Sequence, residues 1–136
     1  MTLNMKRQEE IRQEIKELGG TVVFSKEKGI VYINLIGSNA TDKIFESIQE
    51  LTKLRDLCLS NTKVTDAGIE KLATLTNLRD LYLPNTKVTD AGVEKLSTLT
   101  NLELLVLANT KVTNAKVEKL QKFLPNCRIS CGRNKQ

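Results

Sequence analysis

Leucine recurs along the middle of the chain in the pattern L-x-x-L-x-L, which is typical of short strands with one buried side. The pattern occurs at Leu54, Leu57 and Leu59, at Leu78, Leu81 and Leu83, and at Leu102, Leu105 and Leu107. Because side chains alternate along an extended strand, the last two leucines of each triplet point to the same side. We expect that side to face the core, with Val64, Val88 and Val112 as one further buried position per unit.

The segments that follow these strands repeat almost letter for letter. Residues 61–68 read N-T-K-V-T-D-A-G, residues 85–92 are identical, and residues 109–116 read N-T-K-V-T-N-A-K. The period is 24 residues, and self-similarity at such a period is typical of a stacked solenoid. We therefore predict parallel strands in one sheet, with helices on its convex side. The expected strand centres are Ile33, Leu57, Leu81, Leu105 and Ile129.

Each unit also carries the signals of a short helix. Thr65 and Asp66 provide a helix N-cap, and the carboxylate suits the positive end of the helix dipole. Ile69, Leu72 and Leu75 follow at intervals of three residues, which places them on one face of a helix. This face is expected to pack against the strands.

Residues 1–29 lack the repeat and predict elements of a different kind. The apolar positions of residues 4–18 have the spacing of an amphipathic helix, and the Gly-Gly pair after them would end it. Residues 21–25 indicate a strand, in a hairpin with the strand that begins at Ile30. We expect this segment to cap the solenoid; a partner-binding helix is the alternative. The prediction is one structural domain, with a solenoid of about four repeats and a final strand over residues 30–136.

Residues 30–131, about three quarters of the chain, resemble leucine-rich repeats, in particular bacterial proteins with a V-T-D-A-G-[LIV]-x-x-L signature. The ending L-P-N-C-R-I, residues 124–129, is similar to the last turn of such arrays. The resemblance implies an α/β solenoid, a right-handed curved coil with a concave parallel sheet and convex helices, that serves as a binding scaffold. Threonine stands where the general repeat has Asn or Cys, and its hydroxyl can still bond turn backbone. In the last full unit N-A-K, residues 114–116, replaces D-A-G, which predicts relaxed packing there.

The formal net charge of +5 raises the question of nucleic acid. Most of the excess lies near the C-terminus, at Arg128, Arg133 and Lys135. A second basic feature is a row on the turns after the strands, formed by Lys63, Lys87 and Lys111. This lysine row could follow phosphates or an acidic partner, but no aromatic residues alternate with it, as they do in single-stranded nucleic-acid sites. Polyanion or nucleic-acid binding is therefore the alternative and not the favoured hypothesis.

The residue types present disfavour several kinds of chemistry. The chain has no histidine, which excludes His-dependent triads, Cys-His dyads and the common His metal sites. Cys127 and Cys131 are spaced for a shared metal, but structural zinc takes four ligands and no second pair exists. We predict no metal, no cofactor and no enzymatic activity. The odd number of cysteines, an N-terminus without an apolar signal region and short apolar runs predict a cytoplasmic protein outside the membrane.

One pair of carboxylates is a candidate for acid-base chemistry. Asp56 and Asp80 occupy the same position of adjacent strands, which would place them roughly 5 Å apart on the concave surface. Paired carboxylates can share a proton or flank a sugar bond. Arg55 and Arg79 lie beside them in the same register, so a solvated row of charges is favoured over catalysis. An enzyme remains only a remote alternative.

The concave face is the surface that best indicates a function. Its outward strand positions combine an acidic pair with apolar side chains, a mixture that often marks an interaction site. The predicted partner-binding residues are Asp56, Cys58, Asp80, Tyr82, Leu104 and Val106. The favoured function is a non-catalytic module for protein–protein interaction. The partner's identity stays open, as does whether a second copy of the chain or the tail, residues 132–136, covers this face.

Overall fold

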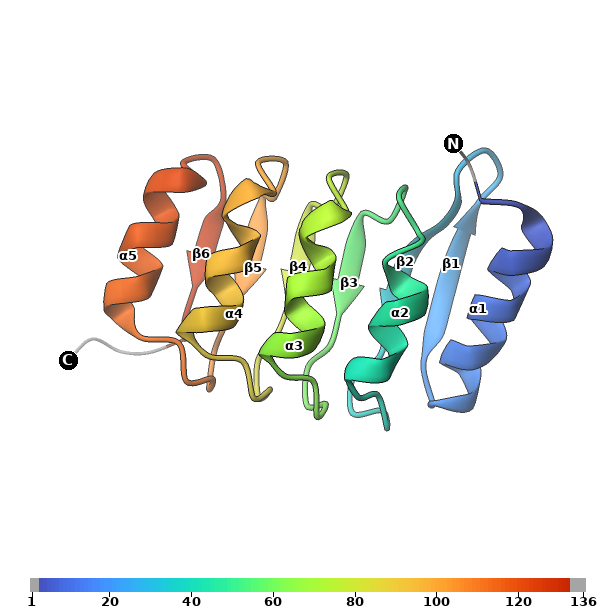
Figure 1. Ribbon diagram of the computed structural model, residues 1–136, viewed down its shortest axis with the longest axis horizontal. Coiled ribbons are helices and arrows are strands. Elements are labelled where there is room, and N and C mark those ends of the chain that lie inside the picture. The colour runs from blue at the N-terminus through green and yellow to red at the C-terminus, as the bar shows by residue number, and fades with distance from the viewer. Residues whose placement is uncertain (1–2, 133–136) are drawn as a thin grey trace.

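The computed structural model describes residues 3–132, so Arg133, Lys135 and most of the tail proposed to cover the concave face lie outside the described part. The described residues form one six-stranded sheet with the order β1-β2-β3-β4-β5-β6. Helices α1 to α5 stand in a row along one face of this sheet (Figure 1). We call the opposite face, which no helix covers, the concave face.

The repeating units contribute the parallel strands of the sheet. These are β2 (Gly29–Asn34), β3 (Asp56–Cys58), β4 (Asp80–Tyr82), β5 (Leu104–Val106) and β6 (Arg128–Ser130). Their central residues pair in register from Ile33 through Leu57, Leu81 and Leu105 to Ile129. The predicted strand centres and the parallel order are confirmed.

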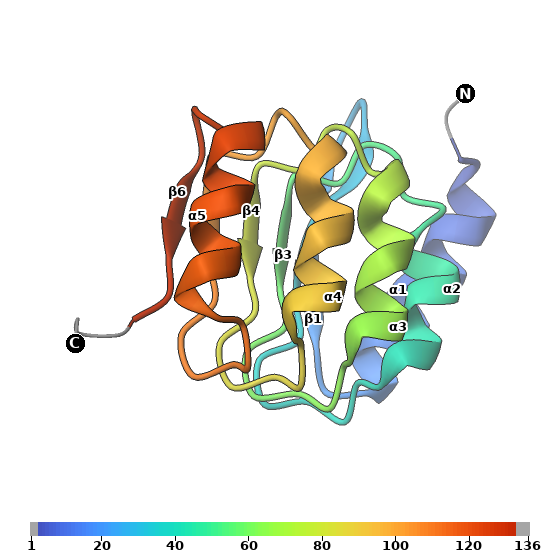
Figure 2. The ribbon, with the colours of Figure 1, turned by 60° about the vertical axis from the view of Figure 1, so that its left-hand side comes forward.

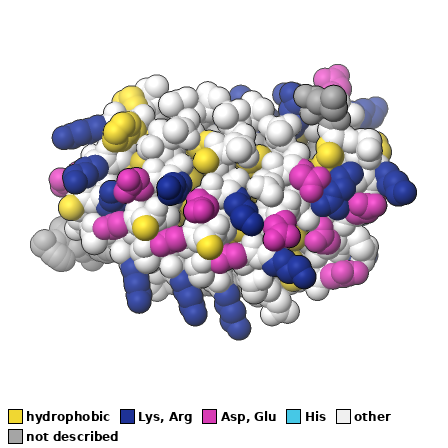
Figure 3. Space-filling model, in the orientation of Figure 1, with side chains coloured by type: hydrophobic (Ala, Val, Ile, Leu, Met, Phe, Trp, Pro, Cys, Tyr) yellow, Lys and Arg dark blue, Asp and Glu magenta, His cyan; other side chains and the backbone are white. Residues whose placement is uncertain are grey.

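The second layer consists of short helices that pack behind the strands (Figure 2). They are η1 (Asp42–Ile44), α2 (Phe45–Ile48), α3 (Asp66–Ile69), η2 (Glu70–Thr74), α4 (Asp90–Glu94), η3 (Lys95–Thr98) and α5 (Asn114–Phe123). Thr65 and Thr89 are their N-caps, as predicted. The core between the layers is mostly aliphatic, with Phe45 as a buried aromatic, and Leu57, Leu81 and Leu105 are fully buried. Acidic and basic side chains are interspersed over much of the outer surface (Figure 3).

Polar side chains join each unit to the next at the start of the helices. The Asp66 carboxylate accepts hydrogen bonds from the backbone N–H of Thr89 (2.8 Å) and from its hydroxyl (2.5 Å). Asp90 accepts the equivalent pair from Thr113, at 2.7 and 2.8 Å. From the sequence, these carboxylates were expected only to interact favourably with the positive N-terminal end of their own helix. The structure adds a link between repeats, worth more than a neutral bond because the acceptor is charged.

The threonines that depart from the general repeat bond the turn backbone, as expected. The hydroxyl groups of Thr62 and Thr86 each donate to a leucine carbonyl oxygen at 2.7 Å, and that of Thr110 does so at 2.8 Å. Thr62 and Thr86 are buried, so these bonds satisfy groups that water does not reach. The substitution therefore leaves the turn intact.

The N-terminal segment forms α1 (Met5–Glu17) and β1 (Thr21–Ser25), and β1 pairs antiparallel with β2. Ile11 and Ile15 on α1 are fully buried against the first unit. The buried Gln8 side chain accepts from the N–H of Ile30 (2.7 Å) and donates to the carbonyl of Leu3 (3.0 Å). The predicted helix and hairpin are confirmed, and they lie where a cap would; the boundary at residue 29 stays a prediction.

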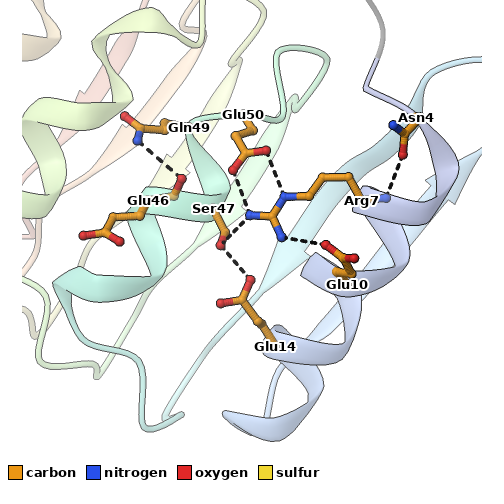
Figure 4. Close-up of polar contacts among 8 residues, drawn as sticks. All are labelled: Asn4, Arg7, Glu10, Glu14, Glu46, Ser47, Gln49 and Glu50. Carbon is orange, nitrogen blue, oxygen red and sulfur yellow. Dashed lines mark hydrogen bonds and ion pairs between the residues drawn. The ribbon is translucent and has the colours of Figure 1, made fainter.

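Arg7 fastens α1 to α2 (Figure 4). Its guanidinium donates to both carboxylate oxygens of Glu50, at 2.9 and 2.8 Å, and also pairs with Glu10 at 3.2 Å. The Ser47 hydroxyl lies next to it, accepting from Arg7 and donating to Glu14. The bond to Glu50 raises the pKa of Arg7, and in return Arg7 lowers the pKa of Glu50. A bidentate pair of this kind fixes orientation as well as adding stability.

The last unit packs differently from the two before it. A Cβ on Gly92 would lie 2.2 Å from a carboxylate oxygen of Asp66, so glycine lets α4 approach α3 closely. Lys116 occupies the equivalent position of α5. Val117, one residue on, is only half-buried, whereas Val93 of the preceding unit is fully buried. The predicted relaxation near the end is confirmed.

Candidate interaction surface

Strand register brings the predicted concave residues together in two rows. One row runs from Tyr32 through Asp56, Asp80 and Leu104 to Arg128. The other includes Cys58, Tyr82 and Val106. Asp56, Asp80, Tyr82, Leu104 and Val106 are each half-exposed, so all five present part of their side chain to solvent.

A shallow hollow of about 400 Å³ lies on the N-terminal part of this face. Its lining residues are Tyr32, Ile36, Asp56, Cys58, Ser60, Asp80 and Tyr82. Leu104 and Val106 lie on the next strand and do not line the hollow, although they pair with Asp80 and Tyr82. The surface is therefore an acidic and aromatic hollow with an aliphatic area on one side.

Cys58 lines the hollow on the concave side but offers little surface to a partner. Only 6% of the residue is exposed, less than at the other predicted positions. Its thiol lies 3.4 Å from the Ser60 hydroxyl at the bottom of the hollow. Strand alternation predicted the correct side of the sheet but not how much of the residue is exposed.

Tyr32 and Ile36 contribute to the hollow although they are not among the predicted partner-binding residues. Both belong to the first, diverged unit, where the leucine pattern is weakest. Ile36 is 52% exposed, which is unusual for a large aliphatic side chain. Alternation from the inward Ile33 and Leu35 does assign both to outward positions, but only the later strands supplied the predicted binding residues.

The Asp56 and Asp80 carboxylates interact directly across the strands. Burial raises the pKa of Asp56, and the charge of Asp80 and a side-chain hydrogen bond with it raise this pKa further. The charges of Arg55 and Arg79 act in the opposite direction. Among the ion pairs of residues 3–132, none joins either arginine to either carboxylate. The pair therefore lies at the hollow without an ion-paired cation, while the charges of the two arginines act on it from a distance.

Tyr82 keeps its hydroxyl proton beside this pair. Burial raises the pKa of Tyr82, and the negative charges of Asp80 and Asp56 add to the effect. A neutral phenol offers one O–H donor and an apolar ring, which is the combination enriched at protein interfaces.

The lysine row lies on a different part of the molecule. Lys63, Lys87 and Lys111 are exposed on the turns that follow the strands, and their backbone N–H groups bond the preceding unit. Basic side chains project in a row from this edge (Figure 3). None of the three lines the concave hollow.

The other cysteines show no feature of a metal site. Burial raises the pKa of the Cys127 thiol to about 11, so it stays protonated at neutral pH. Cys131 is half-exposed and its thiol donates to the side-chain oxygen of Asn114 at 3.7 Å. Within residues 3–132, no three Cys, Asp or Glu side chains come together in a way that could hold a metal ion. In the same residues, no helix is both long and apolar enough to cross a membrane.

Comparison with known proteins agrees with the architecture. Residues 50–73 and 74–97 each match the family model described as "Leucine Rich repeat". The fold is a leucine-rich-repeat solenoid. No curated protein sequence matches the chain.

Several solved structures share this fold. An internalin of Listeria monocytogenes superposes with a TM-score of 0.66 and 23% identity, covering 98% of this chain and 37% of its own. The actin-binding site 2 of leiomodin-1 superposes with a TM-score of 0.64 and 13% identity, covering 98% of this chain and 83% of its own. A leucine-rich-repeat protein of Leptospira interrogans superposes with a TM-score of 0.51 and 27% identity, covering 62% of this chain and 21% of its own. The chain thus spans just over a third of the internalin that it matches, and these likenesses establish the fold.

Proposed function

We propose that this protein is a non-catalytic module that binds another protein on its concave face. The observation that carries the proposal is a group of half-exposed apolar residues, of which Tyr82 lines the 400 Å³ hollow and Leu104 and Val106 lie on the next strand. Solvent-facing strand positions have no packing reason to be apolar, so burial against a partner accounts for them. Leucine-rich repeats generally mediate protein–protein interaction, which supports the proposal.

The partner proposed for this face carries a basic group. Asp56 and Asp80 place negative charge without an ion-paired cation at the hollow, and an incoming Lys or Arg side chain would relieve the repulsion between them. Charge complementarity of this kind contributes to selectivity and association rate more than to affinity. Three unpaired cysteines support a reducing, cytoplasmic location for such a complex.

The test compares two sets of substitutions in pull-down and sedimentation experiments. In the first variant, Tyr82 and Val106 are both replaced by Ser; we expect partner binding or self-association to be lost while the thermal midpoint stays nearly unchanged. In the second, Lys63, Lys87 and Lys111 become Glu, and we expect binding to persist. The opposite result, with binding lost only in the lysine variant, would move the site to the lysine row and contradict the proposal.

A further inference from the structure

The end of α5 exposes a large aromatic side chain that the repeat pattern would bury. A step of 24 residues from Leu99, which is fully buried, leads to Phe123. In the structure Phe123 is 64% exposed, and Leu124 enters the core in its place with 2% exposed. Nothing in the packing of the solenoid therefore requires a phenylalanine at this position.

The helix type explains this shift by one residue. In the preceding unit α4 changes into the 3-10 helix η3, whereas α5 is α-helical from Asn114 to Phe123. An α-helix rises less per residue than a 3-10 helix, so α5 takes one more residue before the chain turns back toward the sheet. Cys127 then occupies the buried position before β6. Leu102 occupies the equivalent buried position before β5, one unit earlier.

A hollow of about 310 Å³ lies between α5 and the helices of the preceding unit. Its lining residues are Glu94, Ser97, Lys116, Lys119, Leu120 and Phe123. Lys116, one of these residues, stands where the preceding unit has Gly92, a position at which a Cβ would meet the Asp66 carboxylate. The hollow is on the helical face of the molecule and shares no residue with the hollow on the concave face.

The residues that line this second hollow carry a net positive charge, with Lys116 and Lys119 against Glu94, although α5 also carries the exposed Glu118. Lys116 pairs with Glu94 at 3.0 Å, which neutralises one lysine. Lys95, Lys119 and Lys122 take part in none of the ion pairs formed by the described residues. The pKa of Glu94 is lowered, first by its bond to Lys116 and also by the charges of Lys95 and Lys119, as expected in a positive field.

We propose that this hollow is a second docking surface, which binds an acidic protein segment bearing an aromatic or long aliphatic side chain. The apolar side chain of the partner would enter the hollow and contact Leu120 and Phe123. Its carboxylates would meet the ammonium groups of Lys119 and Lys122 along the outer side of α5. Hydrophobic, basic and acidic side chains lie together over this end of the molecule (Figure 3). Because this surface is on the helical face, it would leave the concave face free for its own partner.

The test uses a fluorescent peptide of about 12 residues, the length of a short helix that fills a groove. The peptide contains Glu and Ala with one central Leu and one Phe, and its binding is followed by anisotropy at about 0.15 M ionic strength, where long-range attraction is screened. We expect saturable binding that Phe123→Ser weakens at least about tenfold, as for an aromatic residue central to an interface. Lys119→Glu should weaken it similarly. Thermal melts should stay unchanged, since both residues are exposed.

Matched controls distinguish a specific binding surface from nonspecific attraction between lysines and an acidic peptide. Lys63→Glu makes the same charge change on the lysine row and should leave binding within about twofold, because exposed charges far apart are screened. A peptide with Gln in place of Glu, and one with Ser in place of Leu and Phe, should both bind at least about tenfold more weakly.

Four outcomes would overturn the proposal. The first is that the acidic peptide shows no saturable binding, and the second is that Lys63→Glu and Lys119→Glu weaken binding equally. The third is that peptide binding is lost in the concave-face variant, in which Tyr82 and Val106 are replaced by Ser. The fourth is that Phe123 mediates binding to phosphatidylserine vesicles and not to the peptide. The third outcome would assign the peptide to the concave face. Failure here leaves the concave-face proposal standing, because that proposal is tested by different variants.

Discussion

The two middle units of the solenoid and its last unit begin with similar sequences but pack differently. In the middle units Gly68 and Gly92 bring each helix against the Asp of the preceding unit, and Ile69 and Val93 are fully buried. In the last unit a lysine replaces this glycine, the following valine is half-buried, and a longer α-helix turns Phe123 outward. The glycine therefore determines how closely a helix approaches its neighbour.

Regular stacking places identical side chains next to each other, which stabilises some residue types and destabilises others. Identical side chains repeated every 24 residues lie next to their own copies, as in the bond between the side chains of Asn85 and Asn109. Leucine and asparagine gain from this arrangement, because they pack or form hydrogen bonds with their copies. Asp56 and Asp80 lose by it, because like charges are brought together. The irregular last unit avoids such constraints and can present a distinct surface.

The largest expected effect concerns the core of the middle units. Leu81 is fully buried between units on both sides, so Leu81→Ala should reduce the free energy of unfolding by about 2–5 kcal/mol. Ile129 has the same register position in β6 but is half-buried with a neighbour on one side, so Ile129→Ala should cost under about 2 kcal/mol. Urea denaturation of both variants measures the difference. Equal losses would show that the end of the solenoid is packed as firmly as its middle.

A smaller effect on stability is expected at the helix position that is Gly92 in one unit and Lys116 in the next. Gly92→Ala places a Cβ 2.2 Å from the Asp66 carboxylate, which cannot move without losing its two bonds to Thr89. We expect a net loss of about 1–3 kcal/mol, despite the better helix propensity of alanine. Lys116→Ala creates no such contact and should leave stability nearly unchanged, because the pair with Glu94 that it removes lies on the surface. Thermal melts of the two variants provide the comparison, and a neutral Gly92→Ala would refute the role given to this glycine.

Much of the fold could be predicted from the sequence because the period of the repeat is visible there and gives the spacing of the strands. Ile33, Leu57 and Leu81 gave the strand centres directly, and the residues after each strand gave the helix caps. The N-terminal segment was also predictable, because the helix ends at a Gly-Gly pair and the hairpin has a clear turn. The bond from Asp66 to the next unit was not predicted, since it depends on the distance between neighbouring helices.

The surfaces were less predictable than the core. Alternation identified which residues of the concave strands face outward, but not that Cys58 among them is buried. Phe123 was missed because a strict period assigns it to the core. The cue available in sequence was that Leu124 follows it and that Asn126, in place of a leucine, ends the regular spacing. A break in a repeat therefore marks a position at which side-chain direction has to be established from structure.

The acidic pair gives the smallest of the expected effects, and the sign of its pH dependence follows from the raised pKa of Asp56. In the folded protein Asp56 holds its proton more strongly than in the unfolded chain, because of burial and the charge of Asp80. The stability that proton binding provides is fully present below the ordinary pKa of aspartate. It is lost as the pH rises through the raised pKa, where both carboxylates become charged.

Asp56→Asn should therefore stabilise the protein at neutral pH by up to about 1 kcal/mol, the range for like charges directly opposite in a sheet. Water screens the half-exposed pair, which keeps the gain small. Urea denaturation at about pH 7 and about pH 3 measures it, because below the usual aspartate pKa the gain should vanish. Asp80→Asn is the matched control and should give a similar gain, with little added in the double variant. A gain that persists at low pH would show that packing, and not charge repulsion, distinguishes the variant.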